Sequence, residues 1–374
     1  MIGNTAAEIP PDEHQPEAAA APVVQRHPEL TDEQARVRDQ VLADFGKRKV
    51  PEVTLGGYAG TGKTTLIRAL LAALPGWAVC AFTGKAANVL RRKGVSASTI
   101  HSLIYAPAED DFGRTVWRRK DSLYCNGIIV DEASMVSEQL YADLMSFRLP
   151  ILWVGDHGQL EPVGSTFNLM AQPQYRLETI HRNAGAIAQF AEALRHQGLD
   201  APRPESDEVT FLWADALTVR RMTEVDQVCV GMNATRVKAN AAIRGALGRT
   251  GVVEVGDRVM CLRNNRELGL FNGLQAVVTR LRPKDRFDLQ ADGRVWSDVP
   301  FEPSQFGQES APVYRRGQVA MPFDYAYAAT CHKLQGDEAD TVLVIVQQVG
   351  RCDMRRWAYT AATRARRHLV WVTR

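Results

Sequence analysis

The residues Gly57 to Thr64 read Gly-Tyr-Ala-Gly-Thr-Gly-Lys-Thr and match the pattern G-x-x-x-x-G-K-[ST] at every fixed position. A glycine-rich turn between a strand and a helix lets backbone N–H groups approach phosphate oxygens, and the helix N-terminus adds positive potential. A lysine at this position reaches the β- and γ-phosphates, and the following hydroxyl binds Mg²⁺. We therefore predict a site for a nucleoside triphosphate and Mg²⁺, whose phosphate-binding residues are Gly60, Thr61, Gly62, Lys63, Thr64 and Thr65.

Two carboxylates, Asp131 and Glu132, follow an apolar strand candidate at 127–130. The carboxyl ends of parallel strands meet the phosphate loop at one edge of a sheet, so both acids are expected near the phosphates. We predict that Asp131 holds Mg²⁺, usually through water, and that Glu132 is the general base for an attacking water. An acid beside the metal-binding residue favours hydrolysis over transfer to another substrate. Two solvated acids at a strand end are the alternative.

A third polar turn, Gly155 to Leu160, again follows a strand candidate, and its Gln159 is expected to contact the γ-phosphate. The charge that develops on this phosphate needs positive groups from outside the loop. Arg182 and Arg364 are the candidates, and Arg364 lies so far along the chain that a second domain would have to bring it across. Hydrolysis would then depend on domain closure. By residue type alone, either arginine is more often a surface residue.

The bulk composition is that of a globular chain long enough for two domains. The sequence has 374 residues, 45% hydrophobic and 24% charged, with no apolar run that would span a bilayer and no signal peptide. Its six cysteines are scattered without a C-x-x-C pair, so neither a zinc site nor a disulfide framework is indicated. A cytoplasmic setting, with its reducing conditions, is expected.

The net charge of +2 hides an asymmetry, because residues 1–27 carry four acidic residues and one basic residue. The basic excess therefore lies in the remainder, where it is clustered. Such clusters are mostly solvated surface, and their number permits a polyanionic partner without proving one. They lie at 91–93, 118–120, 315–316, 355–356 and 364–367.

The pattern of elements predicts an α/β fold. Residues 1–27, rich in Ala, Pro and Glu, predict a disordered tail, and a helix is expected from Leu30 to Phe45 with Thr31 or Asp32 as its N-cap. Strand candidates alternate with helical stretches, which indicates a parallel sheet. These candidates lie at 52–56, 78–82, 127–130, 150–154, 341–346 and 368–372.

The region 252–320 has a different character. Short strand-like pieces at 252–255, 259–262, 275–278 and 286–289 are separated by Gly, Asn and Asp. This pattern predicts a small β-barrel inserted into the second α/β domain.

From about Leu30 to Arg374 the chain resembles the RecD-like, 5′→3′ branch of superfamily 1 helicases, including the small phage helicases of the Dda type. The motifs occur in the family's order. In this chain they are the Q motif (Leu30 to Gln34), the phosphate loop, motif Ia (Thr83 to Ala87), the segment after it (Ser98 to His101), motif II (Asp131 to Ser134), motif III (Gly155 to Leu160), motif IV (Arg182), motif V (Thr330 to Glu338) and motif VI (Tyr359 to Arg364).

The resemblance implies two RecA-like P-loop domains, at 28–190 and 191–374. It also implies a strand-separating pin at about 104–124 and a barrel like that of Src-homology-3 domains at about 252–320. It implies that Gln34, Gly336 and Glu338 bind ATP, with Gln34 reading the adenine edge. A single-stranded DNA track is implied along both domains, at Thr83, Lys85, Thr99, His101, Thr330 and His332. For the two histidines, a satisfied buried side chain is the alternative.

The expected pin contains Phe112 before Gly113, so this ring is a candidate to stack on the last base pair of a fork. Trp117 could instead support the pin, or both rings could pack onto the first domain. The sequence departs from the family at Phe82 and Glu161, where proline is usual or frequent, which leaves local DNA contacts there in doubt.

The function that this resemblance implies is ATP-dependent translocation on single-stranded DNA and unwinding of forked duplex, by a monomer with replication, repair or recombination partners. One rival is a DNA-stimulated ATPase or translocase that does not unwind. The other is a P-loop kinase, which would leave motifs V and VI without a purpose. Stimulation of ATP hydrolysis by single-stranded DNA discriminates against the kinase, and strand displacement discriminates against the translocase.

Overall fold

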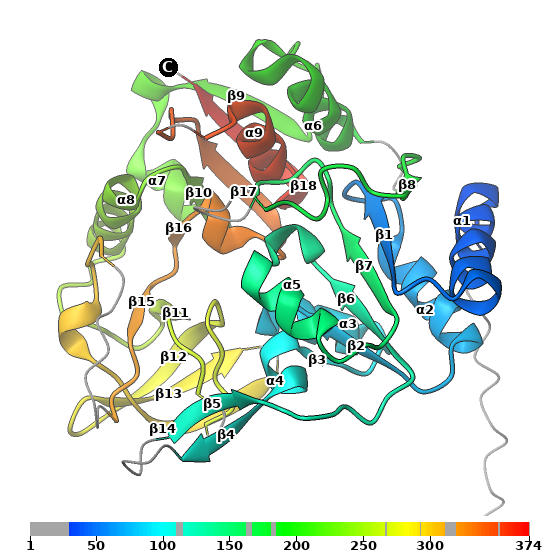
Figure 1. Cartoon of the computed structure of the whole chain (residues 1–374). Helices are drawn as coiled ribbons and strands as arrows, with labels where there is room; N and C mark the ends of the chain where they lie inside the picture. The colour runs from blue at the N-terminus through cyan, green and yellow to red at the C-terminus, as the bar shows by residue number, and fades with distance from the viewer. Residues whose placement is uncertain are drawn as a thin grey trace, which may run out of the picture.

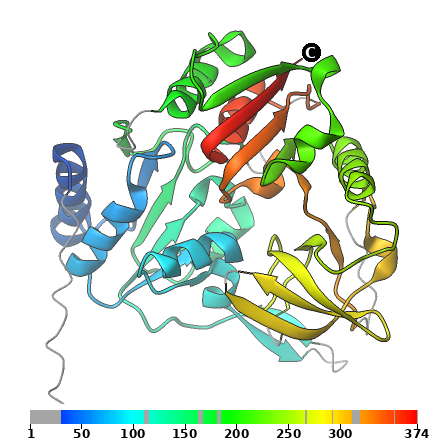
Figure 2. The ribbon, with the colours of Figure 1, turned by 180° about the vertical axis from the view of Figure 1, so that it is seen from behind.

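The computed structural model describes residues 30–109, 115–161, 167–180, 185–265, 268–291, 293–310, 319–350 and 352–373. These residues form two parallel sheets with helices, an antiparallel sheet and a short hairpin (Figure 1). The antiparallel sheet lies on the side of the molecule opposite the first helix in both views (Figures 1 and 2). The expected parallel α/β fold is confirmed. The tail predicted at 1–27 lies outside the described residues.

The first parallel sheet has the order β3-β2-β6-β7-β1-β8. Its strands are β1 (Glu52–Gly57), β2 (Trp77–Ala81), β3 (Ala97–Thr99), β6 (Gly127–Asp131), β7 (Ile151–Gly155) and β8 (Tyr175–Leu177). Its helices are α1 (Asp32–Ala43), α2 (Lys63–Ala73), α3 (Gly84–Arg92), α4 (Ile100–Ile104) and α5 (Glu138–Met145). The strands predicted at 52–56, 78–82, 127–130 and 150–154 are thus present, each within one residue at either end.

Side chains that alternate along these strands enter two different cores, because successive strand residues point to opposite faces. Ile129 and Leu152 pack with α1, α2 and α3, whereas Ile128 and Trp153 pack with α4 and α5. Both faces of the sheet are therefore covered, which explains why its central strands read as continuous apolar runs.

The second parallel sheet has the order β16-β10-β17-β18-β9. Its strands are β9 (Val209–Trp213), β10 (Gln227–Val230), β16 (Ala328–Thr330), β17 (Ala339–Ile345) and β18 (Ala365–Thr373). Helices α6 (Ala186–Gln197) and α9 (Met354–Ala362) share one core with Val344 and Trp371, while α7 (Val219–Thr223) and α8 (Asn233–Ala246) share the other with Leu343 and Val370.

The antiparallel sheet has the order β14-β13-β12-β11-β15. Its strands are β11 (Arg258–Cys261), β12 (Gln275–Arg282), β13 (Arg286–Ala291), β14 (Arg294–Pro300) and β15 (Phe323–Tyr325). The pieces predicted at 259–262, 275–278 and 286–289 fall on three of these strands. A buried carboxylate, Asp257, forms ion pairs with Arg244 of α8 and with Arg249, which follows this helix, and so ties the sheet to α8.

The strand expected at 252–255 is wrong, since these residues form a turn. The Glu254 carboxylate accepts the N–H groups of Thr250 and Gly251 at 2.7 Å each, and the Glu254 N–H donates to Asp257 Oδ2 at 2.7 Å. An acid that captures nearby backbone donors stabilises a turn against a strand, despite the three valines around it.

Strands β4 (Tyr105–Glu109) and β5 (Thr115–Arg119) form an antiparallel hairpin in the interval where a pin is expected. The residues at its tip, Phe112 among them, lie outside the described residues. In the described part of the chain, no helix is long and apolar enough to cross a membrane.

Candidate active site

The predicted phosphate loop connects β1 to α2, at the carboxyl edge of the first sheet. Gly60 and Gly62 have φ angles of 85° and 80°, which side chains rarely adopt, so the glycines allow this tight turn. The Lys63 ammonium donates to the carbonyl oxygens of Gly57 at 2.7 Å and Tyr58 at 3.0 Å. The lysine therefore lies across the mouth of the loop, within reach of the position that phosphate oxygens are predicted to take.

Gln34 packs directly on this loop. Its Nε2 donates to the Thr61 carbonyl at 3.0 Å, and its Oε1 accepts the Thr31 N–H at 3.2 Å as part of the capping box of α1. The side chain is buried. Gln34 thus connects the start of α1 to the phosphate loop.

Asp131 and Glu132 lie at the end of β6. Glu132 has a left-handed backbone, with φ 57°, which is uncommon for a residue with a side chain. Burial raises the pKa of Glu132 to about 7, the charge of Asp131 adds to the rise, and Lys63 opposes it. Burial also raises the pKa of Asp131, against the attraction of Lys63. A carboxyl that titrates near neutrality suits a general base.

The oxygen donors here fit Mg²⁺. The Asp131 carboxylate and the Thr64 hydroxyl are hard ligands of the kind that this ion takes. Among the described residues, no group of three His, Cys, Asp or Glu side chains could hold a metal ion by itself. Mg²⁺ would therefore take its remaining ligands from water and from phosphate oxygens, as it does at nucleotide sites.

Asp156, which is almost completely buried, organises motif III. Its Oδ1 accepts the Gly158 N–H at 2.9 Å, and its Oδ2 accepts Gln159 Nε2 at 3.0 Å. Oδ2 also accepts the hydroxyl of Tyr359, from α9 of the second sheet, at 2.9 Å. Within the described part of the chain, the buried Gln159 Oε1 has no hydrogen-bond partner.

The second sheet reaches this loop through motifs V and VI. The Leu160 N–H donates to Thr360 Oγ1 at 3.0 Å, and its carbonyl accepts Gln335 Nε2 at 3.0 Å. The Tyr359 hydroxyl accepts the N–H of Ala59, a residue of the phosphate loop, at 3.0 Å. The two sheets therefore meet at the phosphate loop and at motif III.

The Arg364 guanidinium is buried between motifs V and VI. It donates to the carbonyls of Thr360 at 2.8 Å, Leu334 at 3.2 Å and Asp337 at 2.8 Å. Its charge is close enough to oppose the raised pKa of Glu132. Arg182 lies outside the described residues.

Motif V lies against motifs Ia and II. A Cβ on Gly336 would lie 3.6 Å from Thr83 Oγ1 and 3.8 Å from Glu132 Oε1, and this glycine has φ 74°. The exposed Glu338 lines a cavity of about 110 Å³ with Lys85 and Arg364. Gly336, which is predicted to bind nucleotide, therefore lies close to the carboxylate of Glu132.

The residues predicted to bind DNA have several surroundings. Thr83 and Thr99 are N-caps, of α3 and α4, so part of their polarity is used locally. Thr330 is buried. His101 is exposed and His332 is half-buried, so the alternative of a buried histidine is wrong for His101. Phe112 lies outside the described residues.

The loop between β11 and β12 also contacts motif Ia. A Cβ on Gly84 would come within 2.4 to 2.7 Å of the Phe271 side chain, and Lys333 of motif V donates to Asn272 at 3.3 Å. Motif Ia, motif V and the antiparallel sheet therefore meet at the N-terminus of α3.

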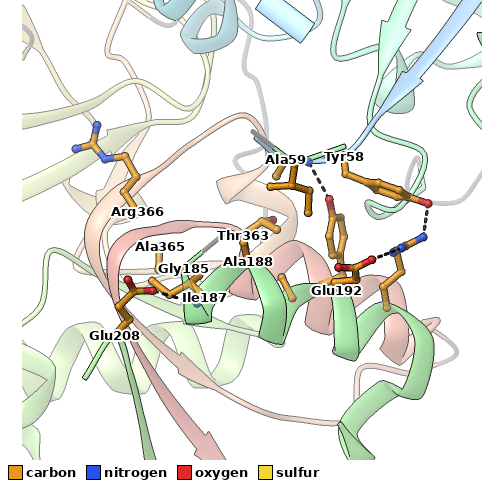
Figure 3. Close-up of a pocket in the computed structure, with 14 residues that line it drawn as sticks. Tyr58, Ala59, Gly185, Ile187, Ala188, Glu192, Glu208, Thr363, Ala365 and Arg366 are labelled. Atoms are coloured by element: carbon orange, nitrogen blue, oxygen red, sulfur yellow. Dashed lines mark hydrogen bonds and ion pairs between the residues drawn. The ribbon is translucent and has the colours of Figure 1, made fainter. Parts of the chain in front are cut away.

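A cavity of about 150 Å³ lies between the phosphate loop and the second sheet (Figure 3). Tyr58 and Ala59 line one side, and residues of α6 and the end of α9 line the other. The Arg195 guanidinium lies 3.9 Å from the centre of the Tyr58 ring, and His157 packs on the same ring at 4.2 Å. The contacts of Tyr58, Asp156, Arg195 and Tyr359 were not predicted from the sequence.

Two family models match the chain, one for an AAA domain at residues 29–206 and one for a UvrD-like helicase C-terminal domain at residues 325–372. The ATP-dependent RecD2 DNA helicase of Deinococcus radiodurans is 30% identical, over 90% of this chain and 48% of that protein. The ATP-dependent DNA helicase dda of Enterobacteria phage T4 is 35% identical, over 31% of this chain and 29% of that protein. The chain is similar to both of these DNA helicases over the parts that align. It spans less than half the length of either relative.

A solved structure is similar to this chain at the level of fold. A structure described as DNA unwinding at forked duplex DNA by two coordinating Pif1 helicases superposes with a TM-score of 0.61. The identity is 20%, over 92% of both chains, so this likeness concerns the fold alone.

Proposed function

We propose that this chain is a RecD-like motor that hydrolyses ATP to move along single-stranded DNA and to unwind a forked duplex. The observation that carries the proposal is the meeting of two parallel sheets at the predicted phosphate loop. Tyr359 bonds to Ala59, and Thr360 bonds to Leu160, across this boundary. The P-loop kinase alternative does not account for a second sheet, or for a motif VI that contacts both the phosphate loop and motif III.

The proposed ATP site uses residues from both halves, 28–190 and 191–374. Lys63 neutralises the β- and γ-phosphates, Glu132 takes the proton of the attacking water, and Gln159 contacts the γ-phosphate. Arg182 and Arg364 supply charge to the transition state. Thr64 and Asp131 hold Mg²⁺, whose contribution when bound is to neutralise phosphate charge. The remaining proposed contacts to nucleotide are Gln34, Gly60, Thr61, Gly62, Thr65, Gly336 and Glu338.

Arg364 needs to move for this role. In the structure its guanidinium donates to carbonyls of motifs V and VI. We propose that ATP between the two sheets draws one N–H of this group onto the γ-phosphate. Hydrolysis would release it, so the distance between the sheets would change with each turnover.

The proposed DNA track runs over motif Ia, the segment Ser98 to His101 and motif V. The meeting of α3, Phe271 and motif V supports a continuous path at this point. The hairpin β4–β5 is proposed as the pin and the antiparallel sheet as the barrel like that of Src-homology-3 domains. Contacts to phosphates and stacked bases would make binding tolerant of sequence and sensitive to salt.

A fork-unwinding assay with 5′-tailed, 3′-tailed and RNA-tailed substrates tests the proposal, with ATPase measured in parallel. We expect single-stranded DNA to stimulate hydrolysis and 5′-tailed forks to be unwound. Lys63→Ala should abolish both activities and leave the fold intact. ATPase without any response to DNA would favour the kinase, and DNA-stimulated ATPase without strand displacement would favour the non-unwinding translocase.

We further propose that the motor acts as a monomer in the cytoplasm of a bacterium or of a phage-infected cell. Its pathway would be replication, repair or recombination. Sedimentation of the chain with a forked substrate tests the monomer, since one chain per fork is the expected result and two chains per fork would contradict it.

A further inference from the structure

The hydroxyl of Tyr359 joins three parts of the molecule. It accepts the Ala59 N–H of the phosphate loop at 3.0 Å and donates to Asp156 Oδ2 of motif III at 2.9 Å. Tyr359 itself belongs to α9, which is packed on the second sheet. One buried oxygen therefore bonds two elements of the first half to one of the second.

The Asp156 oxygen that accepts the Tyr359 hydroxyl also forms a hydrogen bond with Gln159. Asp156 Oδ2 accepts Gln159 Nε2 at 3.0 Å, next to the Tyr359 hydroxyl. Burial raises the pKa of Tyr359 well above its ordinary value, and the Asp156 charge adds to the rise, so the phenol stays protonated and keeps donating. The position of the Gln159 amide thus depends on a carboxylate that the second sheet helps to hold.

The surrounding packing leaves this hydroxyl little freedom. Tyr359 is 3% exposed, and a Cβ on Gly158 would already come within 3.0 Å of its ring. The ring also meets Tyr58 edge to face, with centroids 6.1 Å apart. A ring fixed in this way positions its oxygen for both bonds.

We propose that Tyr359 is a positioning residue, through which the second sheet holds the phosphate loop and the Asp156–Gln159 pair in the arrangement needed for hydrolysis. The inference rests on the proposed ATPase function. Ala59 lies in the loop that surrounds the phosphates, so its orientation affects how they are held. When the sheets separate, Ala59 and Asp156 lose this partner together, and turnover becomes coupled to contact between the sheets.

Tyr359→Phe removes the hydroxyl and retains the ring. The Ala59 N–H then loses its acceptor and Asp156 Oδ2 loses one of its two donors, which weakens the active arrangement, so the single-stranded-DNA-stimulated kcat should fall about 10-fold. The KM for ATP and the Kd for single-stranded DNA should stay within about 2-fold, because the hydroxyl that is removed bonds to Ala59 and Asp156 of the protein itself. Tyr141→Phe is the matched control, since its hydroxyl donates to Glu52 at 2.9 Å at the other end of the strands.

Amide hydrogen exchange provides a readout that does not need activity. In the wild type the Ala59 N–H is protected by the Tyr359 hydroxyl, and in Tyr359→Phe its exchange should be at least 10-fold faster, with no change in Tyr141→Phe. Unchanged exchange at Ala59 would overturn the contact. Faster exchange with an unchanged kcat would overturn the positioning role. A change in the KM for ATP without a change in kcat would overturn it as well.

Failure of the proposed function is distinguishable from failure of this inference. If the wild type hydrolyses ATP without a response to DNA, the motor proposal fails, and the same comparison of kcat is made on the basal reaction. A wild type without ATPase overturns both. Should the phenylalanine variant not fold, Asp156→Asn weakens the acceptor of the same hydroxyl and must reproduce the loss in kcat for the inference to stand.

Discussion

Lys85 of α3 forms an ion pair with Asp337, which belongs to motif V in the second half of the chain. Asp337 also accepts Gln275 Nε2 of β12 at 3.0 Å. This ion pair neutralises a cation that the family resemblance assigns to the DNA track. A phosphate that binds Lys85 must compete with this carboxylate.

Replacing Asp337 should therefore strengthen DNA binding. Asp337→Asn keeps the shape and one of the two oxygen acceptors while it frees the Lys85 ammonium, so we expect the Kd for single-stranded DNA to fall about 3- to 10-fold. One extra phosphate contact should steepen the dependence of log Kd on log salt by about 0.7. Fluorescence anisotropy between 50 and 200 mM salt measures both. Glu224→Gln, which frees the exposed Arg220, is the control, and an equal effect there would mean that net charge alone is responsible.

The raised pKa of Glu132 predicts a pH dependence. A base must be ionised, so kcat/KM for ATP should rise as pH increases from 6 to 8, with a midpoint near the value of about 7 in the free protein. Glu132→Gln should bind ATP and hydrolyse almost none. A flat profile of kcat/KM across this range would show that Glu132 is not the titrating base.

The same pKa has a consequence for stability. A carboxyl whose pKa is raised by folding stabilises the folded state at low pH, and this contribution is lost as pH rises from its unfolded value through about 7. Glu132→Gln should therefore raise the Tm at pH 8 more than at pH 5. Thermal unfolding at the two pH values measures the difference, and an equal shift at both would contradict burial as the cause.

Arg364 should be sensitive to a change that retains its charge. An ammonium cannot reproduce a guanidinium that donates to three carbonyls, so Arg364→Lys should lose about 10²-fold in turnover, nearly as much as Arg364→Ala. ATP binding should weaken less. Steady-state ATPase with single-stranded DNA, together with titration of a fluorescent nucleotide, separates the two effects. Wild-type turnover in Arg364→Lys would remove the guanidinium from the mechanism.

Asp257 should control the attachment of the antiparallel sheet. Burial alone would raise the pKa of Asp257, but hydrogen bonds from Arg244 and Arg249 lower it below its ordinary value. Asp257→Asn leaves two partly buried arginines without their charge partner and should cost about 3–5 kcal/mol of unfolding free energy. In the wild type this stabilisation is complete above the unfolded pKa of about 3.9 and is lost as pH falls below it. Urea unfolding at pH 7 and pH 3 tests this, and a difference of similar size at both would contradict it.

Phe112 remains the sequence-based candidate for the wedge at the fork. Base–aromatic stacking is worth about 1–3 kcal/mol, comparable to opening one base-pair step. Phe112→Ala should slow fork unwinding while DNA-stimulated ATPase stays near normal. Unwinding per ATP, measured on the same fork, decides the matter. No change would reject Phe112 and make Trp117 the next substitution.

The sequence was sufficient for elements whose signals are local. Strand β1, the glycine-rich turn and α2 follow from a fixed pattern within about twenty residues, and the Thr31 cap of α1 follows from its hydroxyl. The turn at 252–255 was missed because valines favour strands. Whether these residues form a turn or a strand depended on the backbone N–H groups that bond to the Glu254 carboxylate.

The contacts between the two halves could not be predicted in this way. Tyr359 and Ala59 are 300 residues apart, and neither residue type carries a signal for pairing with the other. Motif VI indicated that this region matters, but which atom meets which is decided by the packing of α9 on the second sheet. The same holds for Lys85, which the family resemblance assigned to the DNA track and whose partner in the structure is a carboxylate.

The contact of Gly84 with Phe271 constrains how this chain can diverge. Any side chain at position 84 would have its Cβ 2.4 to 2.7 Å from the Cγ, Cδ2 and Cβ atoms of Phe271. Even a smaller residue at 271 would leave its own Cβ too close, so the loop between β11 and β12 has to shift before position 84 can accept a substitution. Single substitutions of Gly84 are therefore expected to be removed by selection. Sequence change at this position requires paired changes around Gly84 and around Phe271, two segments that are far apart in the gene.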